Sequence, residues 1–214
     1  ATFLHTATTL ADGRILIAGG FDTVESMATC PAGLPDGEQI CFALEATNRA
    51  FLFDPSTALF HPTQATMIEA RGGHTASRVT DGRVVLSGGA THGVLAIVKV
   101  GEFADFREFV LLPRNEDGEE EALANAEVFD PELEPELEDL DRDGDPGRGT
   151  FVGDPSQTSR VGIPLNDSRF MHAAAAVPGA NTVLIAGGVG SGSDSYEVFD
   201  IAKPGGMGVY DNQD

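Results

Sequence analysis

A threefold internal repeat is the feature that most restricts the fold of this chain of 214 residues. Each copy begins with a histidine and two small residues, and ten or eleven residues after the histidine an apolar run begins that leads to Gly-Gly. A shorter segment follows, in which an aromatic residue precedes aspartate. Repeats whose parts keep one order indicate a fold built by stacking a unit against its own copies. The two parts lie at 5–20 and 51–54, at 74–89 and 126–130, and at 172–188 and 196–200.

The spacing of the repeats accounts for almost the whole chain. The shortest intervals between corresponding residues give a minimal unit of 48 residues, and three extra segments lengthen the chain beyond three such units. We therefore expect a single domain over residues 1–214. The expected units are at about 2–70, 71–168 and 169–214, and the expected insertions are at 22–48, 91–122 and 131–160.

Each unit has the pattern of short antiparallel strands. Asp12-Gly13 and Asp81-Gly82 each separate two β-prone runs, which predicts type I′ hairpins with φ > 0 at both central residues. The runs before the glycine pairs are apolar at consecutive positions, and this is typical of strands covered on both faces by neighbouring sheets. We expect four strands per unit. The fourth strands are expected near 58–60, 150–152 and 209–210.

The motifs of the second unit carry a family resemblance. They are Met67, Arg71, His74-Thr75-Ala76, Asp81-Gly82-Arg83, Gly88-Gly89 and Phe129-Asp130-Pro131. The series resembles a bacterial kelch repeat of the galactose-oxidase-like β-propeller class, and it recurs three times over nearly the full length. The usual tryptophan of the fourth strand is absent, and Phe60 stands in its place in the first unit.

The resemblance implies an all-β fold: a kelch-type β-propeller segment of about three four-stranded antiparallel blades with long loop insertions. The glycine pairs are expected at equivalent places in the three blades: Gly19, Gly20, Gly88, Gly89, Gly187 and Gly188. Propellers have about four to eight blades, so three blades do not close a ring. We therefore expect that missing blades or other chains complete the propeller, because exposed strands at both ends of an arc invite aggregation.

Acidic residues are concentrated in one insertion. Residues 116–145 carry −14 of the net charge of −21. Within them, Asp139, Asp141, Asp143 and Asp145 match the start of a D-x-D-x-D-G calcium loop. The twelfth position holds Thr150 where an EF-hand has glutamate, so the pattern is closer to helix-free calcium loops of extracellular bacterial proteins. Two interpretations stay open: a Ca²⁺ site, or a solvated acidic linker that binds Ca²⁺ diffusely.

Cys30 and Cys41 lie in the first insertion, among prolines and glycines. An even pair of cysteines in a loop with little apolar mass predicts a disulfide, and hence an oxidising environment. Free thiols or a metal pair are the alternatives, but the spacing is not CxxC and no histidine is near in sequence.

Three histidines, His5, His74 and His172, share one repeat position. Three imidazoles around a channel can hold a metal. The alternative is structural: each histidine, next to Thr or Ala on an inner strand, hydrogen-bonds the neighbouring blade, and recurrence in every unit favours this interpretation. Arg71 and Arg169, three residues before a repeat histidine, are likewise interpreted as parts of the repeat scaffold.

Charge and motifs exclude several classes of function. A net charge of −21 argues against binding nucleic acid or an acidic membrane surface, and no apolar run is long enough to span a membrane. No Walker, G-x-S-x-G or H-E-x-x-H sequence is present. The resemblance to galactose oxidase implies a possible copper site with tyrosine and histidine ligands. The chain has only two tyrosines, Tyr196 and Tyr210, and neither adjoins a histidine, so no copper is expected on this segment. The first residue is Ala1, which we interpret as processing or trimming.

The sequence therefore predicts an extracellular, periplasmic or cell-surface scaffold that binds a protein or glycan ligand through its insertions, with Ca²⁺ as a further ligand. We expect no catalytic residues here. One alternative is a galactose-oxidase-like carbohydrate or alcohol oxidase whose active site lies in blades outside this segment. Another is a subunit of a larger surface assembly.

Overall fold

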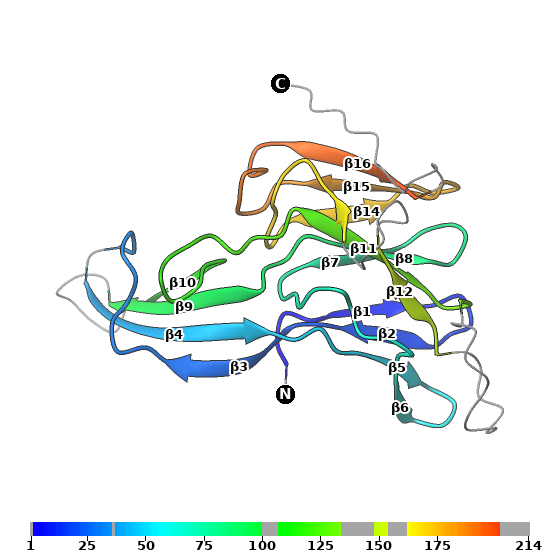
Figure 1. The fold of residues 1–214 in the computed structure, drawn as a ribbon, viewed down its shortest axis with the longest axis horizontal. Helices are drawn as coiled ribbons and strands as arrows, with labels where there is room; N and C mark the ends of the chain where they lie inside the picture. Colours follow the sequence, from blue (N-terminus) through cyan, green and yellow to red (C-terminus); the bar gives the residue numbers. More distant parts are fainter. Residues whose placement is uncertain (1, 36, 100–106, 134–147, 154–161, 202–214) are drawn as a thin grey trace.

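The computed structural model describes residues 2–35, 37–99, 107–133, 148–153 and 162–201. These residues form 16 strands and no helix, so the predicted all-β class is confirmed. The strands make four separate antiparallel sheets (Figure 1). No helix that could cross a membrane occurs in this part of the chain.

Three of the sheets follow the repeat units. The first sheet has the order β1 (Thr6–Thr9), β2 (Ile15–Ala18), β5 (Ala50–Asp54), β6 (Leu59–Pro62). The second sheet has the order β7 (Thr75–Arg78), β8 (Val84–Ser87), β11 (Asn125–Asp130), β12 (Thr150–Val152), with β13 (Ile163–Pro164) also paired to β11. The third sheet has the order β14 (Ala173–Ala176), β15 (Thr182–Ala186), β16 (Tyr196–Asp200). The expected fourth strand of the third unit, at 209–210, lies outside the described residues.

The hairpins between the first two strands differ from the type I′ turns that we predicted. Gly13 and Gly82 have φ of 91° and 95°, whereas Asp12 and Asp81 are not among the residues with positive φ. The Asp12 carboxylate accepts the backbone N–H of Arg14 at 2.9 Å, and Asp81 makes the equivalent bond to the residue two positions on. A longer loop with one left-handed glycine allows this bond, because aspartate binds the backbone two residues ahead.

The three repeat sheets pack face to face through apolar side chains that alternate in direction. Leu16 and Leu52 of the first sheet pack with Leu86 of the second. Val85, the neighbour of Leu86 in sequence, packs with Val183 of the third. All four residues of β8 are buried, as the consecutive apolar pattern predicted for a strand covered on both faces. The same prediction was wrong for β2 and β15, in which buried residues alternate with half-buried or exposed ones. Among the described residues, the first and third sheets each have a repeat sheet on one side only.

The fourth sheet, which we call the inserted sheet, is made by two insertions. It has the order β10 (Arg107–Leu112), β9 (His92–Lys99), β4 (Glu38–Ala46), β3 (Phe21–Ser26). β3 and β4 come from the first insertion, and β9 and β10 come from the second. These segments therefore differ from the irregular loops we expected: they pair with each other and extend to one side of the repeat sheets (Figure 1). The third insertion lies largely outside the described residues.

Candidate functional site

The repeat histidines lie at the contacts between successive sheets. His74 Nε2 lies 3.0 Å from the Thr6 hydroxyl of the first sheet. His172 Nε2 lies 2.9 Å from the Thr75 hydroxyl of the second sheet. His5, at the corresponding place in the first unit, is exposed. Each buried imidazole thus bonds the preceding sheet, which is the arrangement that the structural interpretation requires.

Both buried imidazoles are neutral at neutral pH. Burial lowers the pKa of His74 well below its ordinary value of 6.5, and Arg71 and His172 act in the same direction. Burial, followed by the charges of Arg169 and Arg71, lowers the pKa of His172 to about 4. Neutral imidazole also binds metals, but each Nε2 here is engaged by a hydroxyl group. The described residues hold no group of three or more His, Cys, Asp and Glu placed for a metal.

A buried ion pair links the segment just before β7 to β11 of the second sheet. Arg71 Nη2 lies 2.6 Å from the carboxylate of Glu127 on β11, and both side chains are fully buried. Arg71 also donates to the carbonyl of Gly88 at 2.7 Å. The Glu127 carboxylate accepts the backbone N–H groups of Ile68 and Glu69. This shared network stabilises a pair of charges that burial would otherwise make costly, although the Nε atom of Arg71 is buried without a hydrogen-bond partner.

The third unit repeats this network. Arg169 Nε donates to Glu197 at 3.0 Å, again with both side chains fully buried, and Arg169 also donates to the carbonyl of Gly187. Our reading of the sequence missed the two glutamates as partners. The signal was present, because Glu127 and Glu197 both stand two residues before the repeated aromatic residue. The first unit has Phe51 at this place and therefore lacks the pair.

The glycine pairs have matching backbone conformations in all three units. Their φ angles are 63° and 96° at Gly19 and Gly20, 56° and 96° at Gly88 and Gly89, and 67° and 102° at Gly187 and Gly188. A Cβ atom on Gly19 or Gly88 would lie within 2.5 Å of a carbonyl oxygen of the following sheet, from Arg71 or Arg169. A Cβ atom on Gly187 would meet no following sheet among the described residues, and its nearest atom, 3.9 Å away, is the carbonyl oxygen of Ser193 in the same unit.

The acidic calcium motif lies outside the described residues. It comprises Asp139, Asp141, Asp143 and Asp145. The calcium interpretation and the linker interpretation therefore both remain predictions from sequence.

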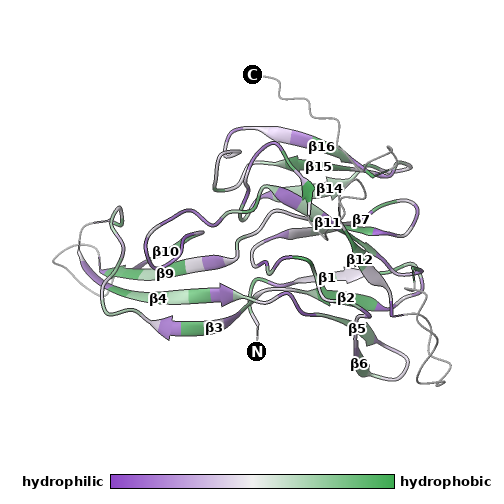
Figure 2. Ribbon diagram, in the orientation of Figure 1, coloured by the Kyte–Doolittle hydropathy of each residue, from purple (hydrophilic) through white to green (hydrophobic). Residues whose placement is uncertain are grey.

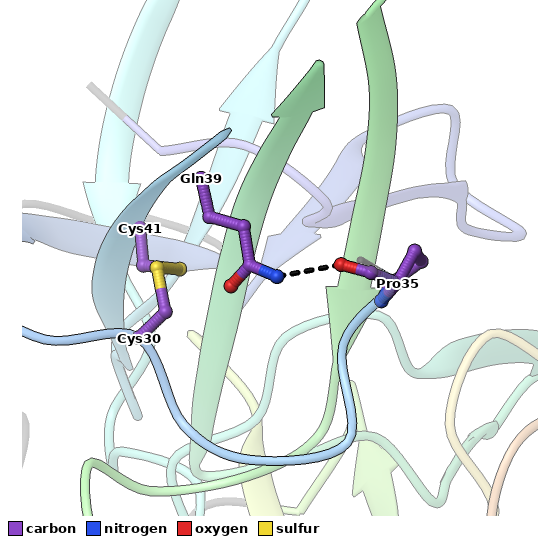
Figure 3. The surroundings of a disulfide bond; sticks show 4 residues. All are labelled: Cys30, Pro35, Gln39 and Cys41. Carbon is purple, nitrogen blue, oxygen red and sulfur yellow. Dashed lines mark hydrogen bonds between the residues drawn. A yellow bond between two sulfur atoms is a disulfide. The ribbon is translucent and has the colours of Figure 1, made fainter. Parts of the chain in front are cut away.

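The predicted disulfide is confirmed. Cys30 and Cys41 are bonded, with their Cα atoms 5.4 Å apart. Cys41 belongs to β4 and is buried, whereas Cys30 lies in the connection between β3 and β4 (Figure 3). The Gln39 side chain donates to the carbonyl of Pro35 at 2.6 Å and ties the same connection to β4. The bond thus holds a segment with little secondary structure against the inserted sheet.

The inserted sheet has two different faces. Cys41 and Val110 are cross-strand partners of Ala96, so the three share one face. Met27 and Leu34 of the disulfide-linked connection pack on this face, and we call it the covered face. The opposite face is buried only near the repeat sheets, where its residues pack with apolar side chains of the first and third units. Those residues are Phe42, Leu44, Leu95 and Leu111.

Farther from the repeat sheets, the second face stays open to solvent, and we call this part the open face. Ile40 and Phe109 are both cross-strand partners of Ile97, which places the three in one row. Phe109 is 68% exposed and Ile40 is 50% exposed. Hydrophobic colour runs along much of β4 and β9 in Figure 2. An exposed apolar row on an ordered sheet is a feature of interaction surfaces.

A charged row lies beside the apolar row. Glu38 and Arg107 are both cross-strand partners of Lys99. Lys99 Nζ lies 4.0 Å from the Glu38 carboxylate, and within the described part of the chain Arg107 makes no ion pair. A hollow of about 130 Å³ is lined by the three charged residues together with Ile40 and Ile97. The open face therefore combines an apolar floor with an excess of positive charge.

A larger hollow of about 440 Å³ opens between hairpin ends of the repeat sheets. Arg78, Thr80 and Asp81 line it together with small apolar residues. The Thr80 hydroxyl donates to a backbone carbonyl of the third sheet, and Asp81 pairs with Arg83. The Thr80 and Asp81 groups are thus used in contacts within the fold, so this hollow is a weaker candidate than the open face.

Comparisons with known proteins add little to the geometry. No protein-family model and no curated protein matches the sequence. A solved structure titled "Structure of YjhT" is similar at 11% sequence identity, and the match covers 100% of this chain and 84% of that one. Its TM-score is 0.33. A similarity this low carries no argument about the fold or the function of this chain.

Proposed function

We propose that this chain is an extracellular or cell-surface binding scaffold of the kelch-propeller type, with the inserted sheet as its recognition element. One observation carries the proposal: insertions from two different units join into a single sheet that extends from the repeat sheets and ends in a row where exposed Ile40 and Phe109 flank half-buried Ile97. A segment that served packing alone would bury such a row. A protein or glycan ligand is expected to cover it.

The repeat sheets supply a rigid support for this element. Their contacts combine apolar cores with buried ion pairs and His–Thr hydrogen bonds. Sites that recognise ligands need such support, because a mobile surface loses entropy on binding. The disulfide holds the connection between β3 and β4 against the inserted sheet, and it favours an oxidising compartment.

The third sheet presents a face that is covered in the other two. Leu16 and Val85 are each 1% exposed, whereas Leu184 at the corresponding position is 41% exposed. We infer that a sheet from further blades or from another chain covers Leu184. Hydroxyl-radical footprinting of protein from its natural source tests this: Leu184 should be protected there and should be modified in the isolated chain of 214 residues. Equal modification in both would contradict the inference.

The calcium interpretation remains part of the proposal. Calorimetric titration should show saturable heat with Ca²⁺ that is lost when Asp141 and Asp143 are changed to Asn. An absence of saturable heat would leave the acidic linker interpretation.

The recognition role can be tested by site-specific photo-crosslinking on cells of the source organism. A photoreactive phenylalanine analogue at Phe109 should give a discrete crosslinked product that an excess of unlabelled protein suppresses. Phe60 is the matched control position, because this phenylalanine is 60% exposed but lies in the first sheet. The same products from both positions, or no product from Phe109, would refute the proposed role of the inserted sheet.

A further inference from the structure

Cross-strand register gives the open face an ordered sequence of properties. The row of Glu38, Lys99 and Arg107 comes first, and the apolar row of Ile40, Ile97 and Phe109 follows it. Along β10, Arg107, Phe109 and Leu111 point to this one face, because they are two residues apart. Along this one strand the face therefore presents the charged Arg107, then the exposed Phe109, then the half-buried Leu111.

The positive charge at this place is unusual for the molecule. Lys99 and Arg107 are direct cross-strand partners, and like charges in such pairs destabilise a sheet. Glu38 contacts only Lys99 among the described charges of this row. The chain as a whole is strongly acidic, with a net charge of −21. A carboxylate supplied from outside would complete the charge pairing that the row itself leaves unbalanced.

The strand that carries Arg107 and Phe109 is also an edge of its sheet. β10 pairs with β9 on one side, and no described residue pairs with its other edge. Unpaired N–H and C=O groups of an edge strand can hydrogen-bond an added strand, and the side chains of that strand then fall in register with those of the edge. Main-chain bonds of this kind bring affinity, and the alternate side chains bring specificity.

We propose that the outer edge of β10 and the open face bind an extended acidic peptide segment of a partner protein. In the antiparallel register, two apolar residues of the segment lie beside Leu111 and Phe109, and a carboxylate lies beside Arg107. The segment therefore reads apolar-x-apolar-x-acidic. This inference rests on the proposed recognition role of the inserted sheet and names the chemistry of its partner.

Fluorescence anisotropy with synthetic peptides tests the inference. The probe is fluorescein-labelled Thr-Thr-Val-Thr-Ile-Thr-Glu-Thr-Thr, and the reversed sequence covers the parallel register. We expect one of the two peptides to bind saturably. Replacing its glutamate by lysine should weaken binding about tenfold or more, and N-methylation of alternate amides should abolish it, because the main-chain bonds are lost.

Matched variants locate the binding on the protein. Arg107→Ser should weaken binding at least about fivefold, and Phe109→Ser at least about tenfold. Phe60→Ser, at an exposed phenylalanine of the first sheet, should leave the affinity unchanged. Circular dichroism spectra that match the unchanged protein show that each variant folds, as expected for exposed side chains.

Several results would overturn the inference. One is that neither peptide binds. Another is that the lysine peptide binds as tightly as the glutamate peptide. A third is that the Arg107→Ser and Phe109→Ser variants bind the peptide as tightly as the unchanged protein. A dimer in sedimentation velocity that dissociates on Phe109→Ser would identify a second copy as the occupant. Displacement of the peptide by an acidic oligosaccharide at lower concentration would identify a glycan. If crosslinking at Phe109 succeeds and the peptides fail, the recognition role stands and this inference falls.

Discussion

Mild acidification should weaken the contacts between the repeat sheets before the carboxylates titrate. His172 is buried at such a contact, and its pKa is lowered to about 4. In the unfolded chain the same imidazole titrates near 6.5, so between these two values the unfolded state binds more protons than the folded state. Its contribution to stability is therefore fully present above pH 6.5 and is lost as the pH falls toward 4.

The size of the effect follows from the two pKa values of His172. The free energy of unfolding should fall by about 2 kcal/mol between pH 7 and pH 5, and by about 3 kcal/mol once the pH is below the folded value. His74, whose pKa is also lowered by burial, adds to the loss in the same direction. The carboxylates of Asp22 and Glu121 have lowered pKa values, so their contribution is lost only below the ordinary values of 3.8 and 4.5. A measurement at pH 5 therefore separates the histidines from these carboxylates.

Urea denaturation at pH 7 and pH 5, followed by far-ultraviolet circular dichroism, measures the loss. The chain has no tryptophan, so fluorescence is less suitable. In His172→Gln the difference between the two pH values should shrink by about 2 kcal/mol. The reasoning is refuted if His172→Gln keeps the full difference, or if an NMR titration of His172 gives an ordinary pKa in the folded protein.

Three further predictions follow from the repeat sheets and the disulfide. Gly88→Ala should cost about 2 to 4 kcal/mol in urea denaturation and Gly187→Ala only about 1 kcal/mol, because both have positive φ but only Gly88 contacts a following sheet; equal costs would contradict this. Arg71→Met should cost about 3 to 5 kcal/mol by leaving the buried Glu127 unpaired, and the double variant with Glu127→Leu should recover part of this loss in a double-mutant cycle. Reduction of the disulfide should remove about 3 kcal/mol, seen as faster proteolysis between β3 and β4 with unchanged protection of β8; general loss of protection would contradict this local effect.

The repeat sheets were largely predictable because their signals are local. The apolar run before each glycine pair predicts a strand covered on both faces. This holds for β8, which is buried at every position, but not for β2 and β15, whose sheets have fewer neighbours among the described residues. The fourth strand of the second unit was predicted at 150–152, where β12 lies. The predicted hairpin type was wrong because an Asp-Gly pair can also form a longer turn, in which the aspartate carboxylate accepts a backbone N–H two residues ahead, as Asp12 does from Arg14.

The inserted sheet was not predictable from the same signals. β4 and β9 pair over eight positions, yet they come from different units and are separated by the whole of β5 to β8. Nothing local in either insertion specifies this partner, because the register between distant strands is set by which faces become buried. The row of Ile40, Ile97 and Phe109 exists only through this pairing. The candidate site therefore could not be located residue by residue from sequence, although the insertions that form it were identified.

The place at which the insertions enter the repeat explains why they meet. The first insertion joins β2 to β5 and the second joins β8 to β11, so each follows a glycine pair at the same point of its unit. Stacked sheets bring equivalent connections side by side, and two long ones in neighbouring units can pair as strands. In the third unit the same connection, 187–195, is short and bonds back to Asp167 and Arg169. The inserted sheet thus needs long insertions in two consecutive units, since one insertion alone gives only a two-stranded hairpin, which is marginally stable in water.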